Sequence, residues 1–517
     1  MLPSSRVILV ALLVTLAAAV RLDRLGAVGF SEDEINKIRA VRAYQQHDFS
    51  ANAEHPMLMK LADWASVGFA PPNVSPEAAL RLPNAIVGSA TTAVLFLLAQ
   101  VLFDTTVGLW TAAIWALDIN AAAINRIGKE DTFMLFFLLL AAYCYERAKA
   151  MAADPHRRDR WFNWSGASFG LMLASKYMPH YFGLHVLFNI AADRNPPDDI
   201  PDKRPAFFAA MAAAFAAANF AILVPAAWRY VLAYLHGNTL RHSGYLFAHQ
   251  LYVNSIEATP WGVPPWFYVT FFATKVPLTI LAAAIVGLVW VTRHPADRGA
   301  TFVRVFLVFT LLPYSLVASK FVRYVLPMLA VIDIAAALGV VWAIRCIRKE
   351  HASATARFAA AAVAAFVLSA LAIQAVAWTP YYGLAQNIVG ARIAAHGLLF
   401  PDDEFYDAGV REAVAEIAGV AGPDAVVCSD ATAVVEEYLH RSGRFDMKAC
   451  SIARDGLPMD RVETWVIAQD GHTYFENEAV FDQLKREFRP WRTVHVDGSV
   501  AVSIFHVRGV EGEGDHQ

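Results

Sequence analysis

The sequence predicts a mostly α-helical, polytopic membrane protein with a C-terminal soluble α/β domain. Of its 517 residues, 57% are hydrophobic and only 17% are charged, whereas soluble proteins have roughly 25% charged residues. Apolar runs recur through the first three quarters of the chain, and the composition changes abruptly after residue 378. We therefore expect a transmembrane domain over 1–378, with an outer loop at 21–83, and an extracytoplasmic domain over 379–517.

The apolar runs predict about eleven transmembrane helices, because a bilayer-spanning helix needs roughly 20 mostly apolar residues. In chain order the predicted spans are 7–20, 84–103, 107–125, 132–145, 162–176, 178–192, 206–227, 266–291, 302–318, 324–344 and 358–378. Several of these runs are short. The first run ends in three alanines and also fits a cleavable signal peptide, an alternative that stays open.

The orientation of these spans follows from their Lys and Arg residues, which are enriched in cytoplasmic loops. They cluster on one side, around residues 147–160, 194–204, 293–304 and 345–357. An odd number of spans places the tail on the other side. We expect an inner-membrane protein with a cytoplasmic amino terminus and a periplasmic C-terminal domain.

Local patterns in the tail predict a small α/β domain. Apolar residues at helical spacing, Val410, Ala413, Val414 and Ile417, predict one amphipathic helix. Further patterns predict strands at 425–428, 464–468, 492–496 and 500–507 and a helix at 478–488. The two tail cysteines, Cys428 and Cys450, are free to pair in an oxidising compartment. No phosphate-binding loop occurs there, so we expect a recognition or stabilising domain.

Composition also excludes several classes of protein. The net charge is −3 and no long Lys or Arg run occurs, so no nucleic-acid partner is expected. Four cysteines in so long a chain exclude a disulfide scaffold, and none has zinc-site spacing.

Three clusters of ionisable residues fall on the predicted outer side. They are Glu32-Asp33-Glu34, Glu54-His55, and the segment 126–131, which begins with Arg126. A single charge run is commonly a solvated face. However, charged groups at membrane depth cost roughly 2.5 to 3.5 kcal/mol each and normally face a cavity or one another. Three clusters on one side therefore indicate a shared site.

At these residues the chain resembles the polytopic lipid-linked-sugar glycosyltransferases of the protein O-mannosyltransferase and aminoarabinose transferase type, with the GT-C fold (glycosyltransferase family 39-like). The resemblance covers roughly residues 1–345. Its segments are the pair Asp33-Glu34, 54–60 in the place of a His-Pro-Pro-Leu box, 81–83, 126–131, 242–245, 275–278 and 320–327. Met57 stands where a second proline is usual, which affects the expected local loop shape.

The resemblance implies transfer of a sugar from a polyprenyl phosphate carrier to an acceptor hydroxyl, with inversion, on the outer face. The acceptor would be a protein, lipid or glycan. Such a reaction needs a carboxylate base and cations that neutralise the departing phosphate. Carried over by position, Asp33 is the candidate base, with Glu34 its neighbour and Glu54 a second acid. We expect the adjacent carboxylates of Glu32 and Glu34 to repel the charge of Asp33 and raise its pKa. The candidate phosphate contacts are His55, Arg126, Arg323, Lys320 and His242.

Several alternatives remain at this point. The three residues Arg126, Arg323 and His242 also have structural explanations. In these, Arg126 pairs with Asp131, Arg323 anchors a helix end at the membrane interface, and His242 is an ordinary loop residue. Carboxylates with His55 also suit a divalent cation, so a metal requirement is open. A transporter or lipid flippase is the alternative function, although the expected related halves with matching broken helices are not visible in the sequence. A further alternative is an inactive relative that scaffolds other envelope proteins.

Overall fold

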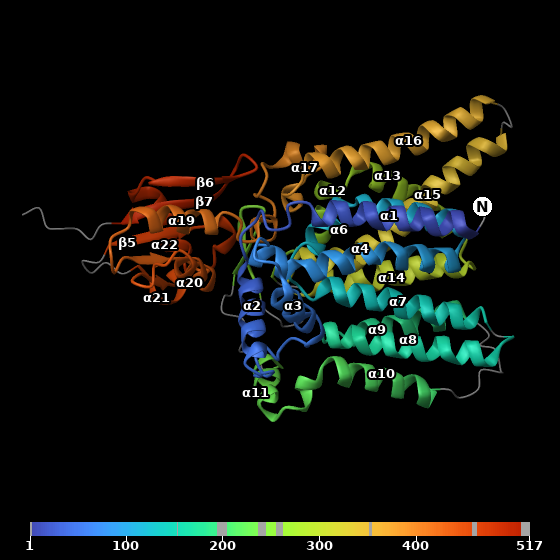
Figure 1. The fold of residues 1–517 in the computed structure, drawn as a ribbon. Coiled ribbons are helices and arrows are strands. Elements are labelled where there is room, and N and C mark those ends of the chain that lie inside the picture. The colour runs from blue at the N-terminus through green and yellow to red at the C-terminus, as the bar shows by residue number, and fades with distance from the viewer. Residues whose placement is uncertain are drawn as a thin grey trace, which may run out of the picture.

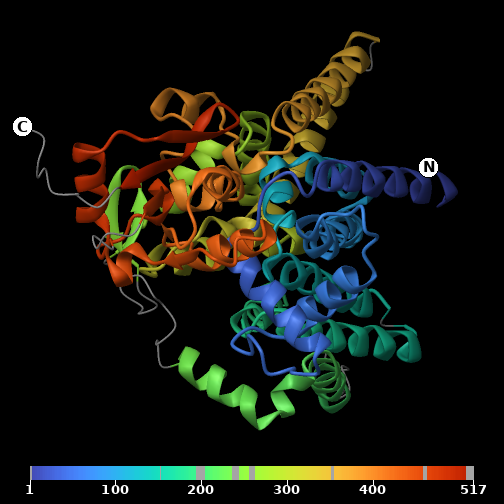
Figure 2. The same cartoon turned by 60° about the vertical axis from the view of Figure 1, so that its left-hand side comes forward.

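The computed structural model contains a helical bundle with a smaller α/β domain at one end (Figure 1). The structure describes residues 3–151, 153–193, 204–235, 244–254, 262–350, 354–457 and 463–507. The bundle helices run side by side, and the C-terminal domain lies beyond the ends of these helices. In the turned view of Figure 2 the orange and red domain again lies at one end of the bundle, so the two parts are adjacent. The predicted fold class is confirmed.

The bundle helices follow the predicted spans, except that the helix in the predicted span 206–227 ends at Ala218. They are α1 (Pro3–Leu22), α4 (Pro76–Leu102), α5 (Thr105–Leu117), α6 (Ile119–Asn125), α7 (Asp131–Lys149), α8 (Pro155–Ser175), α9 (His180–Ala192), α10 (Arg204–Ala218), α12 (Phe267–Lys275), α13 (Leu278–Arg293), α14 (Arg298–Leu316), α15 (Leu326–Glu350) and α16 (Ala354–Ala377). Among the described residues, five helices are long and apolar enough to cross a membrane, or seven if two bent pairs each count as one span. The total of eleven stays a prediction.

Two of the predicted spans are broken, a feature that the hydropathy pattern did not show. Helices α5 and α6 meet at 62°, and α12 and α13 meet at 118°. Asp118 lies at the first break, where its side chain accepts a hydrogen bond from the backbone N–H of Asn120 at the start of α6. Pro277 lies at the second break and has no N–H to continue a helix. The breaks bring Asn120 of α6 and Lys275 of α12 to the wall of the cavity described below.

Helix α15 forms the centre of the bundle and is almost wholly buried. It packs closely on α13 through glycines. A Cβ atom on Gly287 would lie 1.8 Å from the carbonyl oxygen of Ala335, and one on Gly339 would lie 1.9 Å from that of Ala283. Small residues allow helix backbones to approach in this way within membranes.

The first outer loop folds into α2 (Glu32–Gln45) and α3 (Leu58–Phe69), which lie across the end of the bundle (Figure 1). Ser31 and Glu34 form a reciprocal capping box at the start of α2. The three acidic residues therefore occupy a first helical turn, where the helix dipole favours negative charge. Between the bundle helices the chain also forms η1 (Phe220–Leu223), α11 (Pro225–Leu235), the hairpin β1 (Gly244–Phe247) with β2 (Gln250–Val253), and η2 (Val322–Val325).

The C-terminal domain contains a five-stranded sheet in the order β4-β3-β5-β7-β6. Its strands are β3 (Val426–Cys428), β4 (Lys448–Cys450), β5 (Thr464–Ala468), β6 (Arg492–Val496) and β7 (Ser499–Val507). The helical segments before and within it are η3 (Tyr382–Leu384), α17 (Ile388–Ile393), α18 (Pro401–Phe405), α19 (Val410–Val420), α20 (Thr432–Arg441), α21 (Ile452–Asp455), η4 (Asp470–His472) and α22 (Glu478–Glu487). The four predicted strands and both predicted helices are present.

Strand β4 was not predicted, because its three residues carry no alternation of apolar and polar side chains. It pairs in parallel with β3, and Cys450 lies opposite Cys428 in the register. The two cysteines form a disulfide bond, the pairing that the sequence analysis considered for the tail.

The C-terminal domain packs directly on the first outer loop. Phe30, Ile35 and Ile38 belong to the same buried apolar cluster as the apolar face of α19. Arg42 of α2 forms a bidentate ion pair with Glu437 of α20, at 2.8 and 2.6 Å. This shared core holds the domain against the end of the bundle; the chain division at 378 stays a prediction.

Candidate active site

Asp33 lies at the junction of the bundle, the first outer loop and the C-terminal domain. Its Oδ1 is 2.5 Å from Nζ of Lys129, which lies in the turn between α6 and α7. Its Oδ2 accepts a hydrogen bond of 2.7 Å from the Tyr406 hydroxyl and is 3.7 Å from Arg323. The Asp33 side chain is still 32% exposed. Asp33 therefore combines two cations and one hydroxyl donor with access to solvent.

These cations reverse the pKa shift that the sequence suggested. The neighbouring acids Glu32 and Glu34 were expected to raise the pKa of Asp33. Burial does oppose ionisation, but Lys129 and then Arg323 outweigh it, so the pKa of the Asp33 carboxyl falls well below its usual value. The expectation was wrong because Lys129 and Arg323 both lie against Asp33, whereas the neighbouring Glu34 is itself paired with Arg81. Asp33 is ionised throughout the physiological pH range.

Glu34 is fully buried and its oxygens are already bonded. Arg81 of α4 donates to both oxygens, at 2.7 and 2.6 Å. The backbone N–H groups of Gly128 and Ser31 donate to it as well. Glu34 thus ties α2 to α4 and to the turn that carries Lys129. Because its oxygens are occupied, Glu34 is suited to holding the site in place and is not suited to accepting a proton from a substrate.

Glu54 and His55 lie in a second polar cluster around Glu130. Nδ1 of His55 is 3.9 Å from Glu130, which forms a buried ion pair of 2.5 Å with Lys37. Burial, and then Lys37, lower the pKa of His55 well below its usual value. In the ligand-free protein the lowered pKa favours the neutral imidazole of His55. Glu54 accepts a hydrogen bond from Asn52, and its buried Oε2 has no hydrogen-bond partner among the described residues.

Arg126 closes the carboxyl end of α1. It donates to the carbonyl oxygens of Arg21 and Asp23, at 3.0 and 2.7 Å, and its guanidinium lies 5.3 Å from the ring centre of Tyr382. Its alternative partner Asp131 instead pairs with Lys176, at 2.7 Å. Arg126 lines the cavity, but much of its hydrogen-bonding capacity serves the helix end.

The remaining predicted phosphate contacts differ in their availability. Arg323 faces Asp33, and its buried Nε has no hydrogen-bond partner among the residues that the structure describes. Lys320 is 1% exposed and donates to the carbonyl oxygens of Val263 and Val317. It is therefore committed to holding its own loop. His242 lies outside the described residues.

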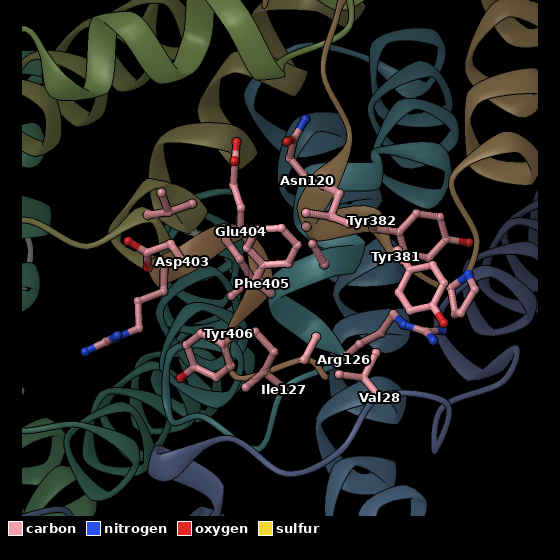
Figure 3. Close-up of a pocket in the computed structure, with 18 of the residues that line it drawn as sticks. Val28, Asn120, Arg126, Ile127, Tyr381, Tyr382, Asp403, Glu404, Phe405 and Tyr406 are labelled. Carbon is pink, nitrogen blue, oxygen red and sulfur yellow. The ribbon is translucent and has the colours of Figure 1, made fainter. Parts of the chain in front are cut away.

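A cavity that is partly open to solvent lies next to this cluster. Figure 3 shows Arg126, Tyr381 and Tyr382 on one side of it and Asp403 and Tyr406 on the other. Tyr406 and Arg323, which both contact Asp33, form part of its wall. The wall of the cavity is therefore formed by the bundle together with segments 380–384 and 403–408.

Sequence reasoning missed the contribution of the C-terminal segment. Asp403 lines the cavity and accepts a hydrogen bond from Tyr245, and burial raises its pKa although Arg323 opposes the shift. Tyr406 bonds Asp33 directly. Neither residue lies in a motif of the resemblance, and the acidic run 402–404 was the only local signal. Among the described residues, no group of three or more His, Cys, Asp or Glu side chains is arranged to hold a metal ion.

Comparisons with known proteins identify the class of this fold. A family model described as dolichyl-phosphate-mannose-protein mannosyltransferase matches residues 61–222, which is less than half of the chain. No curated protein matches the chain in sequence.

Solved structures resemble the whole chain at low sequence identity. ArnT from Cupriavidus metallidurans, bound to undecaprenyl phosphate, is 12% identical with a TM-score of 0.54, over 98% of this chain and 99% of that chain. The oligosaccharyltransferase of Archaeoglobus fulgidus, tethered with an acceptor peptide, is 10% identical with a TM-score of 0.51, over 90% and 69%. AglB from that organism, in complex with an inhibitory peptide and a dolichol-phosphate, has a TM-score of 0.50 and 10% identity, over 90% and 69%. This chain therefore has the GT-C fold and is a multi-pass membrane protein.

Proposed function

We propose that this protein is a glycosyltransferase that moves a sugar from a polyprenyl phosphate carrier to an acceptor hydroxyl. The observation that carries the proposal is Asp33, a partly exposed carboxylate beside a cavity and between Lys129 and Arg323. A carboxylate and two cations are what this displacement requires. The matched family model, and the polyprenyl phosphates bound by ArnT and AglB, support the carrier class.

In the proposed mechanism, Asp33 takes the proton of the acceptor hydroxyl as that oxygen attacks the anomeric carbon. The bond between this carbon and the carrier phosphate breaks, and the phosphate leaves with the bonding electrons. Arg323 suits the departing phosphate because its fork donates two hydrogen bonds and its Nε has no other partner among the described residues. Lys129 contributes a second positive charge. A single displacement inverts the sugar configuration.

The cellular arrangement belongs to the same proposal. We place the amino terminus in the cytoplasm and the C-terminal domain in the periplasm, with the protein in the inner membrane. The Lys and Arg clusters on the opposite side of the predicted spans support this orientation. The Cys428–Cys450 disulfide agrees with an oxidising compartment for the tail.

Incubation of the purified protein with a panel of polyprenyl phosphate sugars tests the proposal. We expect one donor to yield free polyprenyl phosphate, and the yield to rise when the right protein, lipid or glycan acceptor is added. The panel should include carriers of hexoses, mannose among them, and of pentoses, since the identity of the transferred sugar is not fixed by the proposal. Release of no polyprenyl phosphate from any donor, together with movement of the intact carrier across liposome membranes, would favour a flippase instead.

A further inference from the structure

We propose that Tyr406, a residue of the C-terminal segment, is a positioning residue that orients the carboxylate of Asp33 for proton abstraction. This inference rests on the proposed function and deepens it. It assigns part of the active site to a segment that follows the last bundle helix, and not to the membrane domain alone.

The two oxygens of Asp33 have different partners. Lys129 contacts Oδ1 at 2.5 Å, and the Tyr406 hydroxyl donates to Oδ2 at 2.7 Å. Together these contacts fix the rotation of the carboxylate. A base must lie within hydrogen-bond reach of the proton it takes, so this rotation determines which oxygen faces the acceptor. A bound phosphate would attract the charge of Lys129, whereas the Tyr406 hydroxyl is uncharged.

The backbone that carries Tyr406 has an unfavourable conformation. Tyr406 and the following Asp407 both have positive φ angles, 48° and 62°, directly after α18. Two consecutive non-glycine residues in the left-handed region cost free energy, and such residues persist where the surroundings enforce them. This turn directs the Tyr406 ring to the cavity wall (Figure 3).

Asp407 supplies the enforcing contacts. One of its oxygens accepts a hydrogen bond of 2.8 Å from the backbone N–H of Glu32, the residue before Asp33. Its other oxygen is 2.6 Å from His472 and 3.2 Å from Gln469 of the C-terminal domain. The turn that carries Tyr406 and the helix start that carries Asp33 are therefore bonded at two adjacent points. This double link holds the hydroxyl and the carboxylate together.

The groups that face Asp33 are Lys129, Arg323, Tyr406 and, across the cluster, Asp403. The Tyr406 hydrogen bond lowers the pKa of Asp33, in the same sense as the two cations. Its removal therefore raises this pKa. A base with a raised pKa becomes protonated at a higher pH, so activity falls earlier as the solution is acidified.

The test compares Tyr406→Phe with the wild type in the release assay. We expect kcat to fall on the order of tenfold, since a hydrogen bond to a charged group is lost, while KM for the donor changes little. The acid-side decline of kcat should begin at a higher pH. Tyr252→Phe is the matched control, because it removes an exposed hydroxyl whose hydrogen bond, within the described part of the chain, goes to Gln250. It should retain wild-type kcat and pH dependence.

A double-mutant cycle separates positioning from general damage. If Tyr406 acts through Asp33, Tyr406→Phe should have little further effect on the residual kcat of Asp33→Asn, and the two changes in thermal unfolding should be non-additive. Wild-type kcat and pH dependence in Tyr406→Phe, or an equal further loss in the Asp33→Asn background, would overturn the inference. An inactive wild type overturns the proposed function and the positioning role with it. An active wild type with an additive cycle overturns the positioning role alone.

Discussion

Asp33 is paired with Lys129 and Arg323, the same two cations that the proposed mechanism uses for the carrier phosphate. The pairing lowers the pKa of Asp33 and makes it a weak base. A bound phosphate would compete for both cations and add its own negative charge. We therefore expect donor binding to raise the basicity of Asp33, so that the base becomes effective only when the donor is present.

The first residue-scale prediction concerns the base. Asp33→Asn should lower turnover by roughly 10² to 10⁴-fold, the usual effect of losing a general base, while thermal unfolding and carrier binding change little. Glu32→Gln, the neighbouring acid, is the control and should have a mild effect. If Asp33→Asn keeps more than about a tenth of wild-type turnover when chemistry is rate-limiting, the role passes to Asp403, the buried carboxyl on the cavity wall.

The second residue-scale prediction concerns Lys129. Because Lys129 lowers the pKa of Asp33, Lys129→Gln should raise that pKa and protonate the base at a higher pH. The acid-side decline of kcat/KM should therefore move to higher pH, and KM for the donor should rise as one phosphate contact is lost. A pH series with saturating and limiting donor measures both effects. An unchanged pH dependence with a raised KM would show that Lys129 contacts donor only.

At the scale of elements, the close crossing of α13 and α15 supports the broken span that lines the cavity. A side chain on Gly287 has no room, because its Cβ would lie 1.8 Å from a backbone oxygen of α15. The two helices would have to separate, and α12, which is joined to α13 at the 118° bend, would move with them.

Gly287→Ala should therefore lower the midpoint of thermal unfolding and reduce turnover. Gly183→Ala is the matched control, since a Cβ at that helical position meets nothing within 4 Å. Alanine is also favoured over glycine in a helix by about 1 kcal/mol, so the control should be neutral or slightly stabilising. Equal unfolding midpoints for the two variants would contradict the close approach of α13 and α15.

At the scale of the whole molecule, the placement of the site depends on which side of the membrane holds the C-terminal domain. The domain packs on the first outer loop and contributes Tyr406 and Asp403 to the cavity. The loop, the cavity and the domain must therefore share one side.

Reporter fusions test on which side of the membrane the C-terminal domain lies. Alkaline phosphatase fused after Gln517 should be active, because the positive loops place the tail outside the cytoplasm. Fusion of the same enzyme after residue 350, in the predicted cytoplasmic loop before α16, should be inactive. Activity of a strictly cytoplasmic reporter at Gln517 would move the whole site to the other side of the membrane.

The sequence alone determined where the bundle helices and most strands of the tail lie, because hydrophobic runs and periodic spacing are local signals. The apolar runs predicted the positions of the bundle helices, and four strands and two helices of the tail were predicted within about two residues. Asp33 was identified as the central carboxylate through its motif, and Cys428 and Cys450 were identified as potential partners.

Only the tertiary structure decided which charges meet. Tyr406 lies 373 positions from Asp33 in the chain, and no local pattern encodes such a contact. The structure likewise pairs Glu34 with Arg81 and bonds Lys320 to backbone carbonyl groups. The bends between α5 and α6 and between α12 and α13 also depend on tertiary packing, since the apolar run of a broken span is continuous in sequence. The physical reason is that burial, pairing and pKa depend on neighbours brought together by folding, whereas composition and periodicity describe neighbours along the chain.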